Sequence, residues 1–267
     1  MSENGTSEIS ALFDWHEGSL RLLEDCELFA TRLEVADSFL VSDGRALAVG
    51  VHRSRFIESA IARGYPDERE LDAFFGDALQ LVPREADWFP RLEVSSHDGA
   101  YQLHFRLRSA PELQQSVVVA THHGPDPRTE PTIKGPDLGS MLRLRQEAQR
   151  SGAREAVILD GGLVSEGSTS SLMWWRDGRL LVPPSWLPRI PSVTARSIMT
   201  VAAAIGAQVG EEEATPEDLT GCEVWAVNAL HGIRVVRSWI GGPELDADGR
   251  HAARWRPRLT ALTRPLD

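Results

Sequence analysis

The sequence predicts an α/β (α+β) protein built in two halves, and three observations support this class. Alternating apolar segments typical of strands are interspersed with segments of helical periodicity in both halves. The stretch 122–136, HHGPDPRTEPTIKGP, is polar and rich in proline, as linkers are. With 267 residues, 42% of them hydrophobic, each half can bury a core of its own. We expect a domain over residues 1–121, a linker over 122–136 and a domain over 137–267.

In the first half, strand-like residues run over Leu28–Leu40 and on to Val49, interrupted by a turn at Asp43-Gly44. Two helices are expected at His52–Arg63 and Glu68–Leu81, where apolar residues recur three and four positions apart. Three further strands are expected at Trp88–Val94, Tyr101–Arg108 and Ser116–Thr121. The last two of these alternate or concentrate apolar residues as partly buried strands do.

The second half begins with a helix from Asp137, a possible N-cap, to Ser151, with Gly152 ending it. A strand at Ala156–Leu159 follows and ends in the turn Asp160-Gly161-Gly162. Leu172–Trp175 and Leu180–Val182 then flank Asp177-Gly178, which is typical of a hairpin turn.

The chain continues with a helix over Ser192–Ile205, capped by Ser192 and closed by Gly206. Two strands, Glu223–Val227 and Ile233–Ile240, complete the expected elements. Both halves therefore mix strands with helices.

Composition excludes several classes of partner. The net charge is -11 and no basic stripe is present, so we expect no nucleic-acid partner. The longest apolar runs are far too short to span a bilayer, and the polar, acidic N-terminus does not resemble a signal peptide. Cys26 and Cys222 are isolated, as free thiols of a reducing compartment are. We therefore expect a cytoplasmic protein without a membrane segment.

Lys134 is the only lysine among 28 basic residues. Arginine stays protonated in proteins, whereas a desolvated lysine can lose its proton and attack a carbonyl as a neutral amine. Two interpretations follow from composition alone: a Schiff-base lysine that reacts with an aldehyde, or a surface lysine left by chance. Its place at the end of the linker favours the first, because clefts commonly form between domains.

The histidine pair His122-His123 precedes Gly124 and Pro125, in an expected loop. No third ligand lies at a suitable spacing. We therefore predict no metal site.

The order of motifs along the chain resembles a known family. Residues 154–184, REAVILDGGLVSEGSTSSLMWWRDGRLLVPP, contain a strand ending in Asp, a glycine turn, Val-x-Glu, a run of small residues and a hairpin ending before proline. Lys134 lies upstream, PSVTARSIMTVAAAIG and CEVWAVNALHGIRVVRSWIGG lie downstream, and VHRSRF at 51–56 is similar to a His-x-x-Arg-Leu motif. From about residue 38 to 242 this resembles the class-IV aminotransferases, the fold-type IV pyridoxal-phosphate enzymes.

The resemblance implies a two-domain architecture with pyridoxal 5′-phosphate in the interdomain cleft. Lys134 would be the Schiff-base residue and would carry the proton between the substrate Cα and C4′ of the cofactor. Glu166 would pair with the pyridine nitrogen and keep the ring protonated. The alternatives are an exposed linker lysine and an exposed carboxylate at a strand end.

The phosphate would bind where the helix at Ser192 begins, at the first-turn residues Val193, Thr194 and Ala195. Ser192-Val193 stands where Gly-Ile is usual, and Arg196 falls one residue later than a direct overlay expects, so the register is open by one residue. Arg55 would complete the phosphate site, with Arg53 as the competing candidate. Residues two apart on a helix face different directions, so only one of these arginines should point inward.

The remaining implied contacts concern the substrate side. Asn228 would approach the cofactor and Ala229 the substrate, and the hydroxyls of Ser168–Ser171 would lie near the ring. The family often has Asn where Ser171 stands. Arg106 and Arg108 could hold a substrate carboxylate. The family's Gly-Asp-Gly-x-Phe-Glu-like stretch is not recognisable in Leu28–Leu40.

Several reactions are open to the family. The phrase Asn228-Ala229-Leu230-His231-Gly232 looks most like aminodeoxychorismate lyase, which releases pyruvate and 4-aminobenzoate from 4-amino-4-deoxychorismate on the route to folate. An amino-acid transaminase of the branched-chain or D-amino-acid type is the near alternative, and a non-catalytic member of the family the remote one. The resemblance also implies a homodimer.

Overall fold

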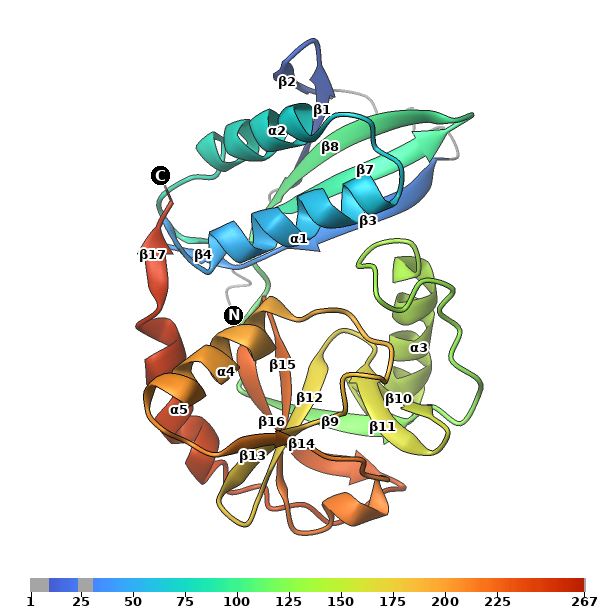
Figure 1. Ribbon diagram of the computed structural model, residues 1–267, viewed down its shortest axis with the longest axis vertical. Helices are drawn as coiled ribbons and strands as arrows, with labels where there is room; N and C mark the ends of the chain where they lie inside the picture. The colour runs from blue at the N-terminus through green and yellow to red at the C-terminus, as the bar shows by residue number, and fades with distance from the viewer. Residues whose placement is uncertain (1–9, 24–30, 267) are drawn as a thin grey trace, which may run out of the picture. The chain divides into compact units, whose positions relative to one another are not determined.

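The computed structural model describes residues 10–23 and 31–266, and these form two compact units (Figure 1). Unit 1 contains the chain up to Glu112 together with the last residues from Arg264, and unit 2 contains Leu113–Thr263. The α/β (α+β) class is confirmed, since each unit combines a sheet with helices. Cys26 and the beginning of the expected strand at Leu28 lie outside the described residues.

Unit 1 is an antiparallel sheet with two helices on one face (Figure 1). The sheet order is β2-β1-β8-β7-β3, formed by Ser19–Leu22, Ser10–His16, Ala100–Arg108, Arg91–His97 and Arg32–Ser38. Helices α1 (Val49–Ala62) and α2 (Glu68–Gln80) bury Phe56, Phe74 and Phe75 completely. Both helices were expected, and Asp67 begins α2 by accepting hydrogen bonds from the amides of Arg69 (2.8 Å) and Glu70 (3.2 Å).

A small second sheet combines three strands from the first half of the chain with one strand from its C-terminal end. Its order is β17-β5-β4-β6, formed by Thr263–Pro265, Arg45–Leu47, Val41–Ser42 and Asp87–Trp88. The predicted turn between β4 and β5 is confirmed, because Asp43 and Gly44 both have positive φ (46° and 69°).

Unit 2 is built on an eight-stranded mixed sheet of order β11-β10-β9-β16-β15-β12-β13-β14. The strands are Leu163–Gly167, Glu155–Asp160, Ser116–Thr121, Gly232–Ile240, Glu223–Asn228, Ser171–Arg176, Arg179–Val182 and Val209–Glu211. Helices α3 (Leu138–Arg150), α4 (Val193–Ala204) and α5 (Arg250–Thr260) and the 3₁₀ turn Glu217–Leu219 accompany it. The hairpin at Asp177-Gly178 has positive φ at both residues (49° and 75°), as predicted.

The chain passes from unit 1 to unit 2 between Glu112 and Leu113, which is before the linker expected at residues 122–136. Strand β9 pairs in parallel with β10 and β16, which makes it a central strand of unit 2. The proline-rich stretch 122–136 is therefore a loop within unit 2, between β9 and α3. Composition marks the loop, whereas strand pairing decides which sheet β9 joins.

Two local details differ from expectation. Asp137 precedes α3 but makes no cap hydrogen bond; its carboxylate accepts the amides of Thr129 (3.0 Å) and Glu130 (2.8 Å) instead. Helix α5 was not expected, because its sequence RHAARWRPRLT is strongly polar and contains Pro257. It is held by burial of Ala252, Trp255 and Leu259 on one face.

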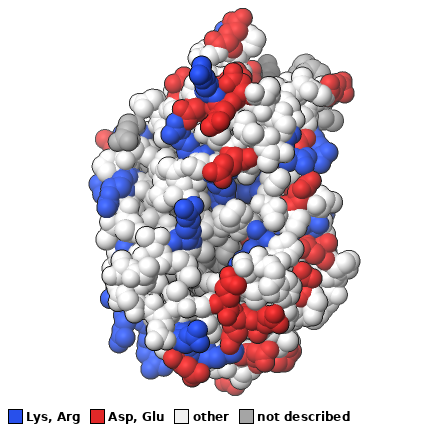
Figure 2. Space-filling model, viewed as in Figure 1, with Lys and Arg blue, Asp and Glu red and all other residues white. Residues whose placement is uncertain are grey.

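No helix in the described part of the chain is long and apolar enough to cross a membrane. On the face shown in Figure 2, acidic and basic side chains are interspersed.

Candidate functional site

Glu166 lies near the end of β11 and is 4% exposed. Its carboxylate pairs with the Arg128 guanidinium and accepts the Ile190 amide at 3.3 Å. Burial raises the pKa of Glu166 to about 7, although the charges of Arg128 and Lys134 and the Ile190 amide act in the opposite direction. The exposed strand-end carboxylate considered as an alternative is therefore excluded.

Arg128 is the partner that the sequence did not reveal. Its side chain is 3% exposed and lies between Glu166 and Asp126, whose Oδ2 is 2.7 Å from the guanidinium. Burial alone would lower the pKa of Arg128, but the bonds to Asp126 and the charge of Glu166 outweigh burial and raise the pKa. Arg128 occupies the same proline-rich loop as Lys134, and that shared loop was the only available signal.

Lys134 is partly exposed and lies close enough to Glu166 for its charge to lower the carboxyl's pKa. Side-chain bonds from Arg128 and Asp137, on either side of Lys134 in the sequence, hold the loop in place. Arg128 binds Glu166, and Asp137 binds the amides of Thr129 and Glu130. The single lysine therefore stands on a braced segment beside a buried carboxyl group.

Glu166 is connected to the start of helix α4 through the segment that precedes the helix. Ile190, whose amide bonds Glu166, precedes Ser192, and the Ser192 hydroxyl caps the helix by accepting the Ala195 amide at 3.2 Å. Among the described residues, neither the Val193 nor the Thr194 amide, nor the Thr194 hydroxyl, makes a hydrogen bond. Of the three predicted first-turn residues, Val193 and Thr194 thus keep their amides available, while that of Ala195 is used by the cap.

A hollow of about 320 Å³ lies at the start of α4. It brings together Thr132 from the loop of Lys134, Ser171 at the start of β12, and Ala195 and Arg196 of α4. Its wall is completed by the segment that leads into α4, from Val182 to Ser192. Three stretches of chain far apart in sequence therefore meet in unit 2.

Asn228 ends β15, next to the pairing of Ser171 with Val227. Its amide side chain donates to the Thr169 carbonyl (3.2 Å), and its Oδ1 accepts the amides of Leu230 (3.2 Å) and His231 (2.8 Å). Asn228 therefore shapes its own loop, and Ala229 is the first residue of the turn that joins β15 to β16.

In unit 1, Arg55 points inward from α1, and its guanidinium binds Asp37 of β3 through two 2.8 Å contacts. His52, one turn earlier, also contacts Asp37, with Nδ1 2.7 Å from Oδ1. Asp37 is 1% exposed and was not singled out in the sequence. The spacing of His52 and Arg55 on one helix face could have suggested a shared acidic partner.

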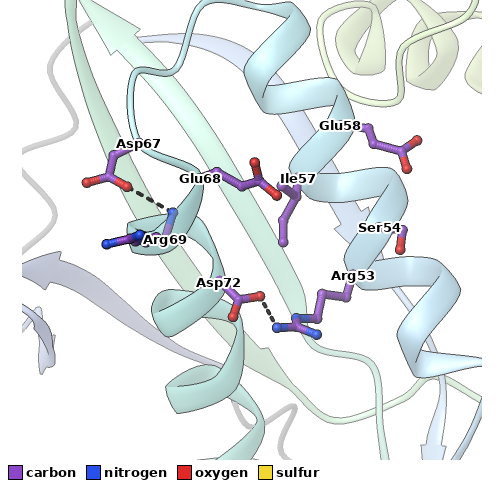
Figure 3. Close-up of a pocket in the computed structure, with 8 residues that line it drawn as sticks. All are labelled: Arg53, Ser54, Ile57, Glu58, Asp67, Glu68, Arg69 and Asp72. Carbon is purple, nitrogen blue, oxygen red and sulfur yellow. Dashed lines mark hydrogen bonds and ion pairs between the residues drawn. The ribbon is translucent and has the colours of Figure 1, made fainter.

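Arg53 points the other way, into a hollow of about 740 Å³ beside α1 and α2 (Figure 3). There it forms an ion pair with Asp72, and both side chains are nearly half exposed. The wall is acidic and open, and it contains none of the predicted site residues except Arg53. Arg55 is therefore the inward arginine of the two.

Arg106 and Arg108 project from β8 on the face opposite Leu103, Phe105 and Leu107. Arg106 lies opposite Arg91 and contacts Glu93 (3.4 Å), while Arg108 donates to the Phe89 carbonyl (3.2 Å). Burial, together with the charges of Arg91 and Arg106, lowers the pKa of Arg108 to about 10. In the described part of the chain, no carboxylate forms an ion pair with Arg108.

Within unit 1, the predicted residues occupy both faces of the five-stranded sheet. Asp37 lies opposite Leu92, which is fully buried on the helix-covered side, so Arg55 is on that side. Arg106 and Arg108 are on the other side. In unit 2, Glu166 lies near Lys134 and is bonded to the segment that leads into α4, and Ser171 and Ala195 line the hollow at the start of that helix. Lys134, Glu166 and Asn228 are not among the residues that line the hollow, and Asn228 is joined to Thr169. In unit 1, Arg55 lies on the opposite face of the sheet from Arg106 and Arg108.

No group of three or more possible metal ligands occurs among residues 10–23 and 31–266. His122 instead contacts the Pro125 carbonyl, with Nε2 at 3.1 Å.

Known proteins resemble this chain in both sequence and fold. The branched-chain-amino-acid aminotransferase of Escherichia coli K12 is 30% identical over 141 aligned residues, and the match covers 47% of this chain and 46% of that protein. The enzyme of the same name from Pseudomonas aeruginosa is 34% identical over 139 residues, 46% and 45% of the two chains. The chain thus spans about half the length of the curated relatives it matches.

Solved structures match over nearly the whole chain. A branched-chain aminotransferase from Thermoproteus uzoniensis has a TM-score of 0.82 and 17% identity, covering 96% of this chain and 100% of that one. A hypothetical aminotransferase from Mycobacterium tuberculosis, in its apo form, has a TM-score of 0.80 and 21% identity, covering 97% and 99%. At these identities the likeness concerns the fold alone. The family model "Amino-transferase class IV" matches residues 34–239, and the chain therefore belongs to the class-IV aminotransferase family.

Proposed function

We propose that this protein is a pyridoxal-phosphate-dependent aminotransferase that moves an amino group between an amino acid and a 2-oxo acid. The observation that carries the proposal is the buried Glu166 carboxyl, placed between the single lysine, Lys134, and the start of α4. The curated relatives named branched-chain-amino-acid aminotransferase support it.

The donor set of unit 2 fits the family's cofactor. Pyridoxal 5′-phosphate presents an aldehyde, a basic ring nitrogen and a phosphate, and it withdraws electrons from the substrate Cα when bound. A lysine amine, a buried carboxyl group and a helix start with two available amides correspond to these three groups in chemical type. Lys134, Glu166, Val193 and Thr194 would hold them.

Lys134 would bind the aldehyde carbon and later move a proton between the substrate Cα and C4′. Arginine cannot replace it, because a guanidinium does not give up its proton in proteins. The bonds that Arg128 and Asp137 make in the same loop would keep the amine in place.

Glu166 would hold a proton on the ring nitrogen. A buried carboxyl group interacts more strongly with such a partner than an exposed one, since little water screens it. Arg128 stays charged and lies against the same carboxylate, so it would favour the ionised form of Glu166.

Arg55 would add a cation to the phosphate, as the family resemblance implies. Arg106 and Arg108 would bind the substrate carboxylate. Arg108 is partly buried, the charges of Arg91 and Arg106 act on it together with that of Glu93, and it forms no ion pair among the described residues, which favours an incoming anion. A homodimer and a cytoplasmic location stay predictions from the sequence.

Aminodeoxychorismate lyase is the second candidate, and one feature favours it. Asn228-Ala229-Leu230-His231-Gly232 resembles the lyase group, and its loop is joined to Thr169, three residues from Glu166. This reaction would release pyruvate and 4-aminobenzoate.

A product assay separates the two reactions. Purified protein loaded with pyridoxal phosphate is mixed with an L- or D-amino acid and no acceptor. A transaminase releases about one equivalent of 2-oxo acid per site and then stops until 2-oxoglutarate is added. The same protein is then given 4-amino-4-deoxychorismate. Repeated release of pyruvate with 4-aminobenzoate, and no oxo acid from any amino acid, would reject the transaminase and support the lyase.

A further inference from the structure

A buried ion pair joins two strands that are not neighbours. Glu155 of β10 is 0% exposed and Arg234 of β16 is 3% exposed, with Oε2 and Nη2 2.9 Å apart. Strand β9 lies between β10 and β16 in the sheet. The pair therefore reaches across one strand inside the core of unit 2.

Glu155 also binds the loop that follows Glu166, residues 167–171, which we call the first loop. Its carboxylate accepts the hydroxyls of Ser168 (2.9 Å) and Thr169 (2.8 Å) and the Thr169 amide. The carboxylate thus makes four contacts, counting Arg234. Three of them determine where the first loop lies relative to β10.

Arg234 lies in β16, two residues after the end of the second loop, residues 228–232. Asn228 of the second loop donates to the Thr169 carbonyl of the first loop (3.2 Å). Its Oδ1 accepts the amides of Leu230 and His231. Both loops are therefore connected to the buried Glu155–Arg234 pair. The first loop is bonded to Glu155, and the second loop is linked through Arg234, which lies just after it in the chain, and through the bond from Asn228 to Thr169.

A buried ion pair such as Glu155–Arg234 contributes little net free energy to the stability of a core. Removing two charges from water costs several kcal/mol each, so a matched apolar pair is often as stable. Here Arg234 also leaves its Nε without a hydrogen-bond partner in the described structure. A position filled at such a cost is better explained by the orientation it imposes than by stability.

We propose that the Glu155–Arg234 pair is a positioning device that sets the first loop against the second. The inference rests on the proposed function, in which both loops line the cofactor and substrate. Under this proposal, neither Glu155 nor Arg234 contacts the reacting atoms. Their effect passes through Thr169 and Asn228.

The first test needs no cofactor. Hydrogen exchange, read by mass spectrometry on the intact chain, is compared among wild type, Arg234→Met, the conservative Arg234→Lys and a control, Arg176→Met. The control removes the Arg176–Glu212 pair (2.6 Å), at the opposite end of β12 from Ser171. We expect Arg234→Met to speed exchange in both loops at least about tenfold, and Arg234→Lys and Arg176→Met to leave both loops near wild type. Faster exchange confined to β16, or equal in all peptides, would overturn the proposal.

The second test asks whether the positions of the loops matter for binding. The dissociation constant for pyridoxal phosphate is measured by fluorescence titration on the same variants, and we expect at least about a tenfold rise for Arg234→Met only. If the wild-type protein does not bind pyridoxal phosphate, the proposed function is refuted. The hydrogen-exchange experiment would then still test whether the Glu155–Arg234 pair positions the two loops. Wild type that binds, with Arg234→Met within twofold of it, would refute the positioning role.

The double variant Glu155→Met/Arg234→Met guards against misfolding, since it leaves no unpaired buried charge. Under our proposal it folds but keeps fast loop exchange and weak cofactor binding. Wild-type exchange and binding in the double variant would show that neither residue is needed to position the loops, and the proposal would be wrong.

Discussion

Replacing Glu166 with Gln should increase the stability of the cofactor-free protein relative to wild type as the pH rises. The carboxyl has a pKa of about 7 in the fold, against 4.5 for a free glutamate, because it is buried. A raised pKa means that the folded state favours the neutral form. The corresponding stability is present below pH 4.5 and is lost as the pH rises through 7. Gln resembles the neutral form and does not titrate.

The size of the effect follows from the interval between the two pKa values. Each unit corresponds to about 1.4 kcal/mol, so the interval from 4.5 to about 7 gives roughly 3 kcal/mol. The unfolding free energy of Glu166→Gln minus that of wild type should rise by about this amount from pH 4.5 to 8. Taking the difference removes the titration of groups that both proteins share.

Urea unfolding followed by tryptophan fluorescence measures this difference. Of the eight tryptophans, only Trp15 and Trp88 lie outside unit 2, so the signal reports mainly the unit that contains Glu166. Glu213→Gln, at an exposed position of the same unit, is the control and should give a flat difference. A flat or falling difference for Glu166→Gln would show that Arg128 keeps the carboxyl ionised despite burial, and would refute our reasoning.

Three further changes test other parts of the molecule. Lys134→Arg should abolish turnover and the cofactor adduct that borohydride reduction fixes, because a guanidinium cannot form the imine; an adduct of normal yield by mass spectrometry would disprove the role of Lys134. Arg108→Met should raise KM for the amino-acid substrate at least about tenfold with a smaller change in kcat, while the exposed Arg69→Met should not, and equal kinetics would remove Arg108 from the substrate site. Glu223→Gln should lower the unfolding free energy by about 1–3 kcal/mol, since the buried carboxylate accepts the His251 (2.9 Å) and Ala252 (2.8 Å) amides that begin α5, and an unchanged urea midpoint would contradict this.

Local sequence patterns predicted most of the elements. The Asp-Gly turns at 43–44 and 177–178, the Ser192 cap and the periodicity of α1 and α2 each depend on residues adjacent in sequence. Backbone conformation and short-range hydrogen bonds decide such features, so they can be read locally. Helix α5 was not predicted because its apolar face is small and its sequence, RHAARWRPRLT, is rich in arginine and contains a proline.

The membership of β9 could not be predicted in the same way. An apolar strand fits the centre of either sheet, and its partners β10 and β16 are distant in the chain. Composition pointed to the proline-rich stretch as a boundary, although the chain passes from one unit to the other before β9. Pairing between remote segments is a property of the whole fold.

The sequence by itself determined the family, because the order of motifs around Glu166 does not depend on geometry. The same motifs and the lone lysine carry the proposal for the chemical groups of the site. Only the tertiary structure decided the surroundings of those groups. It placed Arg128 against Glu166, Asp37 against Arg55, and the Glu155–Arg234 pair beneath two loops. Charge pairing and burial act between residues that are close in space, and spacing along the chain does not show which distant residues will be brought together.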